Sequence, residues 1–362
     1  MSGARSPGRG GGPMARVVAD LRGRFSGFPV PEGEFNPSKA PPELLRHYGL
    51  PPKPDAETQP RLREAWERGF GKPMLLQAFE VEPDFVQQTQ YRLFRKHQSE
   101  APHAATRFET SGNWSGAYVT ANRDRQFLQV WGMWKIPDKL QFPSPPQQGT
   151  AGVPYICANW IGLDGQRLYL DSSLPQVGTA STLEANDTTT AQAWTQWWAR
   201  DSPCNVPLPI GLAVAPSDEV LCVITARNPR TVVFVMVNLS ATLPTATVVK
   251  GTSPPVTLPD KGTVHPDIAG ATAEWIMERP RVVGQATPDN FPDYGETKFE
   301  LCIAVEGDDV DTASWSGGLL QDLQGARRIR MFDVLQDPAR TAFISMPREL
   351  DAASVRVRYG GF

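Results

Sequence analysis

The sequence predicts an all-β protein of antiparallel strands, and two observations support this fold class. Runs of β-branched and aromatic residues recur from Asn113 to near the C-terminus, with turn signals between them. No helical pattern of useful length separates these runs, whereas a parallel α/β sheet would need crossover helices. Many short strands without such helices indicate an antiparallel β-sandwich or barrel.

The clearest strand-like runs share high β-propensity and short length. They are residues 127–134, 219–226, 231–237, 271–277, 298–305 and 354–359. We therefore expect a β-sandwich domain over residues 111–362.

The N-terminal part of the chain has a different character. Residues 1–24 are rich in Gly and Arg, and we expect them to be disordered. Residues 25–110 form an extension that is punctuated by prolines, with two short helices expected at 41–48 and 61–68. Neither helix is long enough to form a domain, so the extension should pack against something else. A propeptide, a lid over the site and an accessory arm all stay open.

Composition and charge exclude several classes of protein. The formal net charge is −3 and the pI is about 5.9, whereas a nucleic-acid-binding domain is usually strongly basic. No apolar run approaches the length of a membrane span. The first residues are positively charged but lack a following apolar segment, so we see no secretory signal peptide.

The chain has four cysteines, which are too few for a disulfide scaffold in a protein of this size. Cys157, Cys222 and Cys302 lie in apolar, strand-like runs, and we expect buried free thiols. One bridge, for example through Cys204, stays open if the protein is exported.

The common hydrolase signatures do not occur. The four histidines show no close ligand pairing, and there is no Gly-x-Ser-x-Gly elbow and no phosphate-binding loop. If the chain is an enzyme, its chemistry should come from carboxylates and amides, with no metal and no organic cofactor.

Four segments in the β region carry a family resemblance. They are Asn113-Trp-Ser-Gly-Ala117, Trp160-Ile-Gly-Leu-Asp-Gly165 with Leu174-Pro-Gln-Val-Gly178, Ala193-Trp-Thr-Gln-Trp-Trp198, and Ala273-Glu-Trp-Ile-Met-Glu278. In this order they resemble the motifs of the glutamic peptidase (eqolisin) family, over roughly residues 110–305. The resemblance implies a sandwich of two large antiparallel sheets, concanavalin-like, with the active site on a concave sheet face.

The resemblance also implies the catalytic residues. The family's catalytic glutamine would be Gln176, with Gln166 a distant second, and its catalytic glutamate would be Glu274. Glu278 lies at an even offset on the same strand face, where we expect a supporting role at most. Without the family motif, Glu274 would be taken for an outward-facing, solvated residue of a strand.

A glutamate and a glutamine suit the hydrolysis of an amide. The carboxylate can take a proton from water and pass it to the leaving amine. The carboxamide can donate N–H groups to the developing oxyanion, and its carbonyl oxygen can hold the water. Because a carboxamide does not titrate, it keeps its donor at any pH.

Five further residues are expected to bind substrate, and each has an ordinary structural alternative. They are Trp114, Trp160, Asp164, Trp194 and Gln196. The tryptophans could equally be core residues, and Asp164 could be a turn residue before a glycine. Gln192 and Gln196 stand where the fungal enzymes of the family have acids. The loss of two carboxylates should reduce like-charge coupling to Glu274, which favours mildly acid or neutral working conditions.

We therefore expect a monomeric endopeptidase that acts on a protein or peptide substrate and binds neither nucleic acid nor membrane. The compartment is not readable, because the missing signal peptide indicates the cell interior whereas the family is secreted. The rival hypothesis is a weak or inactive sandwich that binds peptides or glycans through a Trp-lined groove.

Overall fold

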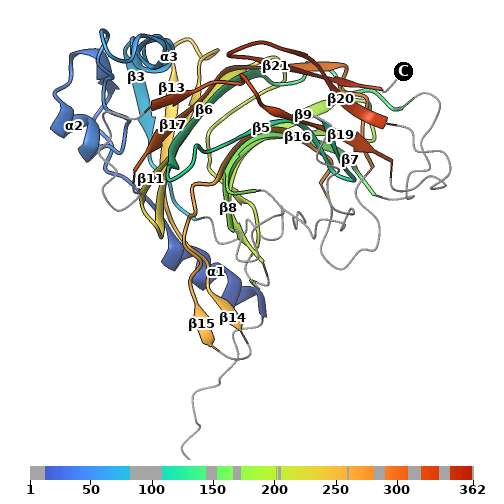
Figure 1. The fold of residues 1–362 in the computed structure, drawn as a ribbon, viewed down its shortest axis with the longest axis horizontal. Helices are drawn as coiled ribbons and strands as arrows, with labels where there is room; N and C mark the ends of the chain where they lie inside the picture. The colour runs from blue at the N-terminus through green and yellow to red at the C-terminus, as the bar shows by residue number, and fades with distance from the viewer. Residues whose placement is uncertain are drawn as a thin grey trace, which may run out of the picture.

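The computed structural model describes residues 13–81, 108–143, 153–165, 173–200, 202, 205–258, 261–280, 290–308, 319–333 and 343–360. The predicted all-β class is confirmed: the chain forms one large, mainly antiparallel sheet (Figure 1). Two pairings in the described residues, β3–β13 and β4–β19, are parallel.

The sheet folds over into two layers that face each other. The site layer contains β5 (Trp114–Thr120), β7 (Tyr155–Leu163), β8 (Ser173–Leu183), β9 (Thr189–Ala199), β10 (Leu208–Pro209), β16 (Thr272–Glu278) and β19 (Arg327–Phe332). The back layer contains β6 (Gln126–Lys135), β11 (Glu219–Asn228), β12 (Thr231–Asn238), β13 (Thr245–Thr252) and β17 (Glu296–Gly307).

The two layers belong to one continuous sheet. Strands β20 (Phe343–Leu350) and β21 (Val355–Tyr359) join β19 of the site layer to β17 of the back layer. Four shorter strands complete the described β structure after the extension: β4 (Phe108–Ser111), β18 (Leu319–Gln321), and the hairpin of β14 (Val256–Leu258) and β15 (Gly262–Val264).

The space between the layers is filled by the inward-facing side chains of both. Val130 and Trp134 of β6 lie in one buried cluster with Ile161 of β7 and Trp275 of β16. The indole nitrogen of Trp134 donates to Oγ1 of Thr179 at 3.0 Å, which links β6 to β8. Since strand side chains alternate between faces, the even positions of β16 and β8 must point outward, away from this core.

The described part of the N-terminal region, residues 13–81, packs on the back layer. It contains α1 (Pro13–Arg24), β1 (Phe25–Gly27), β2 (Glu34–Phe35), a 3₁₀ turn (Pro37–Lys39), α2 (Pro42–His47), α3 (Pro60–Phe70) and β3 (Met74–Gln77). Trp66 and Phe70 of α3 are fully buried in a cluster with Trp131 and Leu221 of the back layer. In addition, β1 and β3 hydrogen-bond to β13, so residues 25–77 are an integral part of the fold.

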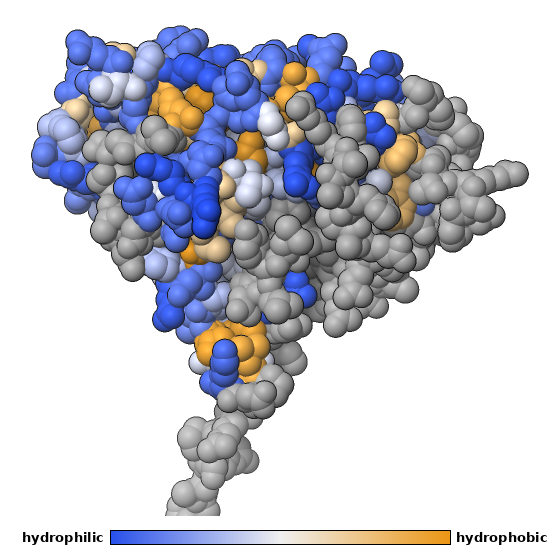
Figure 2. All heavy atoms as spheres, viewed as in Figure 1, coloured by the Kyte–Doolittle hydropathy of each residue, from blue (hydrophilic) through white to orange (hydrophobic). Residues whose placement is uncertain are grey.

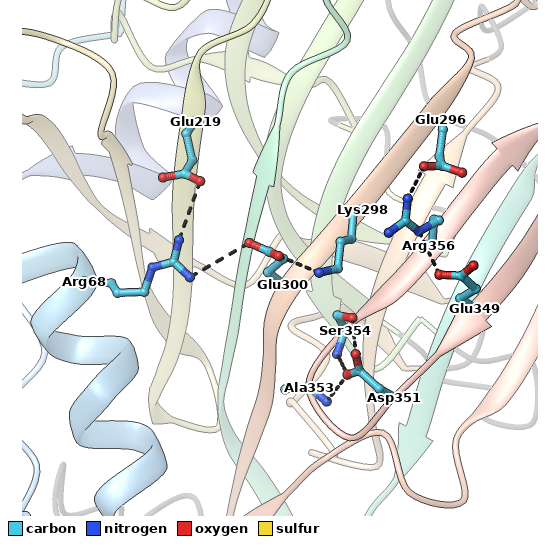
Figure 3. Close-up of polar contacts among 10 residues, drawn as sticks. All are labelled: Arg68, Glu219, Glu296, Lys298, Glu300, Glu349, Asp351, Ala353, Ser354 and Arg356. Atoms are coloured by element: carbon cyan, nitrogen blue, oxygen red, sulfur yellow. Dashed lines mark hydrogen bonds and ion pairs between the residues drawn. The ribbon is translucent and has the colours of Figure 1, made fainter.

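An ion-pair seam fixes α3 to the back layer. Arg68 reaches Glu219 at 3.6 Å and Glu300 at 3.9 Å, and Lys298 pairs with the same Glu300 at 2.7 Å (Figure 3). Beside them, Arg356 pairs with Glu296 and Glu349 (Figure 3). These groups are partly exposed, so each ion pair contributes little to stability. The alternating charges favour one position of α3 on the back layer.

One expectation about the N-terminus is corrected. Residues 13–24, which we expected to be disordered, form α1, because Leu21 is fully buried and Arg24 pairs with Asp20 at 2.6 Å one turn earlier. Residues 1–12 lie outside the described residues. The two other expected helices are confirmed as α2 and α3, with bounds shifted by one or two residues.

The surface in the view of Figure 2 is mostly hydrophilic, with apolar residues in small patches. One of these patches lies at the tip formed by α1 and the β14–β15 hairpin (Figures 1 and 2). Within the described part of the chain, no helix is long and apolar enough to cross a membrane.

Candidate active site

A row of paired residues crosses four strands of the site layer. Glu274 of β16 pairs with Gly162 of β7, Gly162 pairs with Gln176 of β8, and Gln176 pairs with Gln196 of β9. Residues in register on adjacent strands point to the same face of a sheet. Glu274, Gln176 and Gln196 therefore share the outer face, which curves away from α2 and α3 (Figure 1).

Gln176 and Gln196 form a buried amide pair. Nε2 of Gln176 donates to Oε1 of Gln196 at 2.6 Å, and the two residues are only 2% and 1% exposed. The hydroxyl of Thr195 donates to the backbone carbonyl of Gln176 at 3.0 Å and holds β8 against β9. Gln196 thus contacts the predicted catalytic amide directly.

Glycine at position 162 leaves room for aromatic and aliphatic side chains in the centre of the row. A Cβ placed on Gly162 would lie 2.7 Å from Cδ1 of Leu174 and 2.9 Å from Cζ3 of Trp160. These two side chains therefore occupy the space above Gly162, between Glu274 and Gln176. They form the floor of the site at this point.

Glu274 is engaged by the turn that follows β7. It is fully buried, and its Oε1 accepts from the hydroxyl of Thr272 at 2.5 Å and from the backbone N–H of Gly165 at 2.8 Å. One donor is a side-chain hydroxyl of β16 itself, and the other is a backbone N–H of the turn after β7. These contacts tie the end of β7 to the start of β16.

Asp164 anchors the loop that leads into β16. Its backbone has φ of 65°, in the left-handed region that Asp tolerates better than most residues. Its carboxylate accepts from the backbone N–H groups of Ala269, Gly270 and Ala271 at 2.6 to 3.0 Å. Burial raises the pKa of Asp164 to about 6, although these backbone donors act in the opposite direction. These contacts are those of the turn alternative for Asp164, and substrate binding by this residue stays a prediction.

Glu278 is a second buried carboxylate on the outer face of β16, four residues after Glu274 and 3% exposed. Its Oε2 accepts from the indole nitrogen of Trp160 at 2.7 Å, and its Oε1 accepts from the side-chain amide of Asn113 at 3.1 Å. Burial raises the pKa of Glu278 to about 7, and hydrogen bonds from Trp114, Trp160 and Asn113 lower it in part.

Aromatic side chains line the same face. Trp114 and Trp160 meet edge to face with ring centroids 5.0 Å apart, and both belong to a cluster with Trp194 and Leu174. Trp198 of β9 packs against this cluster, whereas Trp197 and Trp275 point into the core between the layers. The structure therefore brings the three predicted substrate-binding tryptophans together on the site face, beside the two glutamates and the amide pair.

Sequence reasoning missed Tyr118. It continues the row beyond Glu274, and its hydroxyl donates to Oε1 of Glu109 at 2.5 Å, beside Arg327. Burial, with the neighbouring carboxylate of Glu109, raises the pKa of the Tyr118 phenol. The available signal was its even offset from Trp114 on β5, which places both on one face.

Several predicted features lie elsewhere. Gln166, the alternative glutamine, and Cys204 lie outside the described residues. Cys157, Cys222 and Cys302 are buried free thiols, as expected. In the part of the chain that the structure describes, no group of three His, Cys, Asp or Glu side chains could hold a metal ion.

This face combines a neutral amide pair, a buried carboxylate and aromatic walls, a combination suited to acid–base attack on an amide bond. Residues 112–336 match the family model described as the Peptidase A4 family. Because the match covers more than half of the 362 residues, the chain belongs to this family and is a glutamic-type peptidase.

Solved structures with similar folds include members of the same family. A scytalido-glutamic peptidase bound to a peptide-based transition-state analogue has a TM-score of 0.47 and 15% identity, covering 68% of this chain and 98% of the other. SCP-B, an eqolisin in complex with the tripeptide Ala-Ile-His, has a TM-score of 0.45, 15% identity and the same coverage. The aspergilloglutamic peptidase of Aspergillus niger has a TM-score of 0.41 and 18% identity, covering 57% and 99%. Among curated proteins, none matches the chain significantly.

Proposed function

We propose that the chain is an endopeptidase that cleaves peptide bonds on the outer face of the site layer. Gln176 and a glutamate of β16 act on the scissile peptide group and the attacking water. The family membership supports the reaction class, and the shared face of the two side chains supports the pairing. The substrate lies along the aromatic wall of Trp114, Trp160 and Trp194.

The sequence pattern predicts Glu274 as the general base, whereas the hydrogen-bond partners of the two glutamates favour Glu278. Glu274 accepts from Thr272 and from the backbone of Gly165, which suits a residue that fixes the turn after β7. Glu278 instead accepts from side chains of the site face, and its pKa of about 7 is close to the value a general base needs near neutral pH. Its raised pKa, combined with side-chain donors that fix its orientation, is the observation that carries this assignment.

The proposed reaction uses only water, Glu278 and Gln176 besides the substrate. Ionised Glu278 takes a proton from water while the water oxygen attacks the carbonyl carbon, and a tetrahedral intermediate forms. The Gln176 carboxamide donates an N–H to the oxyanion. Protonated Glu278 then gives its proton to the leaving nitrogen, the C–N bond breaks, and a carboxylic acid and an amine leave.

A binding module without catalysis is the competing function, and the aromatic wall is the observation that favours it. A digest of denatured casein with purified protein tests the choice. We expect cleavage by the wild-type protein and none by Glu278→Gln. If casein stays intact at every pH while the protein binds it, the binding function takes precedence.

A further inference from the structure

Gln196 is more than a neighbour of the catalytic amide. Its Oε1 accepts from Nε2 of Gln176 at 2.6 Å, in a place where both side chains are almost fully buried. This hydrogen bond therefore fixes the orientation of the Gln176 carboxamide, with its nitrogen toward Gln196. A carboxamide without such a partner could rotate by half a turn and exchange its donor for its acceptor.

The pair leaves one donor and one acceptor unused. Nε2 of Gln196 and Oε1 of Gln176 are both buried, and neither has a hydrogen-bond partner among the described residues. A buried polar group without a partner costs on the order of 1–3 kcal/mol, so such groups point to a ligand or to water. A donor and an acceptor on adjacent side chains are complementary to the C=O and N–H of a peptide backbone.

We propose that Gln196 is a positioning and substrate-binding residue: it orients Gln176 through its Oε1, and its Nε2 donates to a backbone carbonyl of the bound peptide. The inference rests on the proposed peptidase function and adds a specific contact to it. The ligand is neutral main chain, because the strands on both sides of Gln196 carry no charged residue on this face among those described. On β8 and β10 the neighbouring positions are Leu174, Gln176, Gly178 and Pro209.

Charged and titratable groups do share the wider face, and they must be considered in any pH experiment. They are Glu274 and Glu278 of β16, Tyr118 of β5, Arg327 of β19 and Glu109 of β4. A control with the same added charge on β9 corrects for their influence. Gln192 offers this control, since it lies four residues before Gln196 on the same face and is half-buried.

The experiment uses Gln196→Glu, which separates the two roles. A glutamate keeps the acceptor for Nε2 of Gln176, but when ionised it has no donor for a substrate carbonyl. Binding of fluorescein-labelled casein is measured by anisotropy at pH 5 and pH 8, in full-length protein that also carries Glu278→Gln to prevent cleavage. The matched control is Gln192→Glu in the same background.

We expect Gln196→Glu to weaken casein binding at pH 8 by about tenfold. The ionised carboxylate cannot donate the hydrogen bond, and it repels the carbonyl oxygen of the substrate. At pH 5 the carboxyl at this almost fully buried position should be protonated, because burial raises the pKa of a carboxyl group. Its O–H then supplies a donor, so binding should return to within about threefold of the background protein. Gln192→Glu should change binding less than about twofold at either pH. Equal binding by the Gln196 and Gln192 variants at pH 8 would overturn the substrate contact.

The positioning role has its own test, which also applies if Gln196→Glu does not fold. Gln196→Met keeps the length of the side chain but removes both polar atoms, and it should lower kcat on casein by about tenfold or more in protein that is still folded. Wild-type kcat in this variant would contradict the positioning role. Failure of the proposed function would look different: the wild-type protein itself would leave casein intact at every pH.

Discussion

The indole nitrogen of Trp160 lies 2.7 Å from Oε2 of Glu278 and donates a hydrogen bond to it. The contact joins an aromatic side chain of β7 to a carboxylate of β16 across two paired strands. It fixes the orientation of the carboxylate and places it against the aromatic wall. The apolar setting raises the pKa of Glu278 to about 7, whereas the hydrogen bond from Trp160 lowers it in part.

The first prediction concerns stability and pH. Burial raises the pKa of Glu278 from 4.5 to about 7, so the folded protein binds this proton more tightly than the unfolded chain. Stability from this group is complete below pH 4.5 and is lost as the pH rises toward 7, by about 3 kcal/mol in total. Urea unfolding at pH 5 and pH 8 should show a smaller free-energy difference between the two conditions in Glu278→Gln than in wild type. An identical difference in both proteins would mean that Glu278 titrates normally.

A second prediction concerns the rate of peptide hydrolysis. If Glu278 is the base, it must be ionised in the free enzyme, and kcat/KM on casein should rise with pH along a limb centred near 7. The limb should be absent or displaced in any residual activity of Glu278→Gln. A rate that is flat from pH 5 to pH 8 would exclude Glu278 as the titrating base.

The extension should contribute to stability without affecting the chemistry. Trp66 is fully buried against the back layer, and its indole donates to the carbonyl of Pro51 at 2.9 Å. Trp66→Ala should cost about 3–5 kcal/mol of unfolding free energy. At a temperature where the variant is folded, kcat/KM should stay within about threefold of wild type, because the site lies on the opposite layer. A loss of kcat in folded protein would show that the extension also acts on the site.

The proposed mechanism predicts that peptidase activity survives three classes of inhibitor. EDTA and serine-directed reagents should leave casein hydrolysis unchanged, since the mechanism uses neither a metal nor a serine nucleophile. Thiol reagents should also be ineffective, because burial raises the pKa of Cys157, Cys222 and Cys302 and closes them off. Loss of activity with EDTA that added zinc restores would point to a metal site.

The sequence predicted the fold class well because the strand-like runs are rich in β-branched and aromatic residues and no helical pattern separates them. It did not predict that one continuous sheet folds over through β20 and β21, since strand order depends on contacts between distant residues. Helix α1 was missed for a related reason. Its local composition favours disorder up to Pro13, and the burial of Leu21 that stabilises it is a tertiary contact.

The sequence-based prediction of the site was limited for the same reason, because it lacks contacts between distant residues. Side-chain alternation predicted that Glu274 and Glu278 share one face of their strand, and the strand register of the structure adds Gln176 to that face. The same alternation cannot distinguish Glu274 from Glu278, since both satisfy it. What separates them is their hydrogen-bond partners: a local turn for Glu274, and Trp160 and Asn113 for Glu278.

Casein hydrolysis by the matched variants Glu278→Gln and Glu274→Gln tests the central claim most directly. Both changes remove one carboxylate from the same face of β16 and keep the size of the side chain. The account predicts that Glu278→Gln lowers kcat by about 10²–10⁴-fold, the usual contribution of a general base, in protein that is still folded. Glu274→Gln should lower kcat less than about tenfold and act mainly on the unfolding midpoint, as expected for a lost turn contact. Near wild-type turnover by Glu278→Gln, with loss of activity in Glu274→Gln, would contradict the account and assign the base to Glu274.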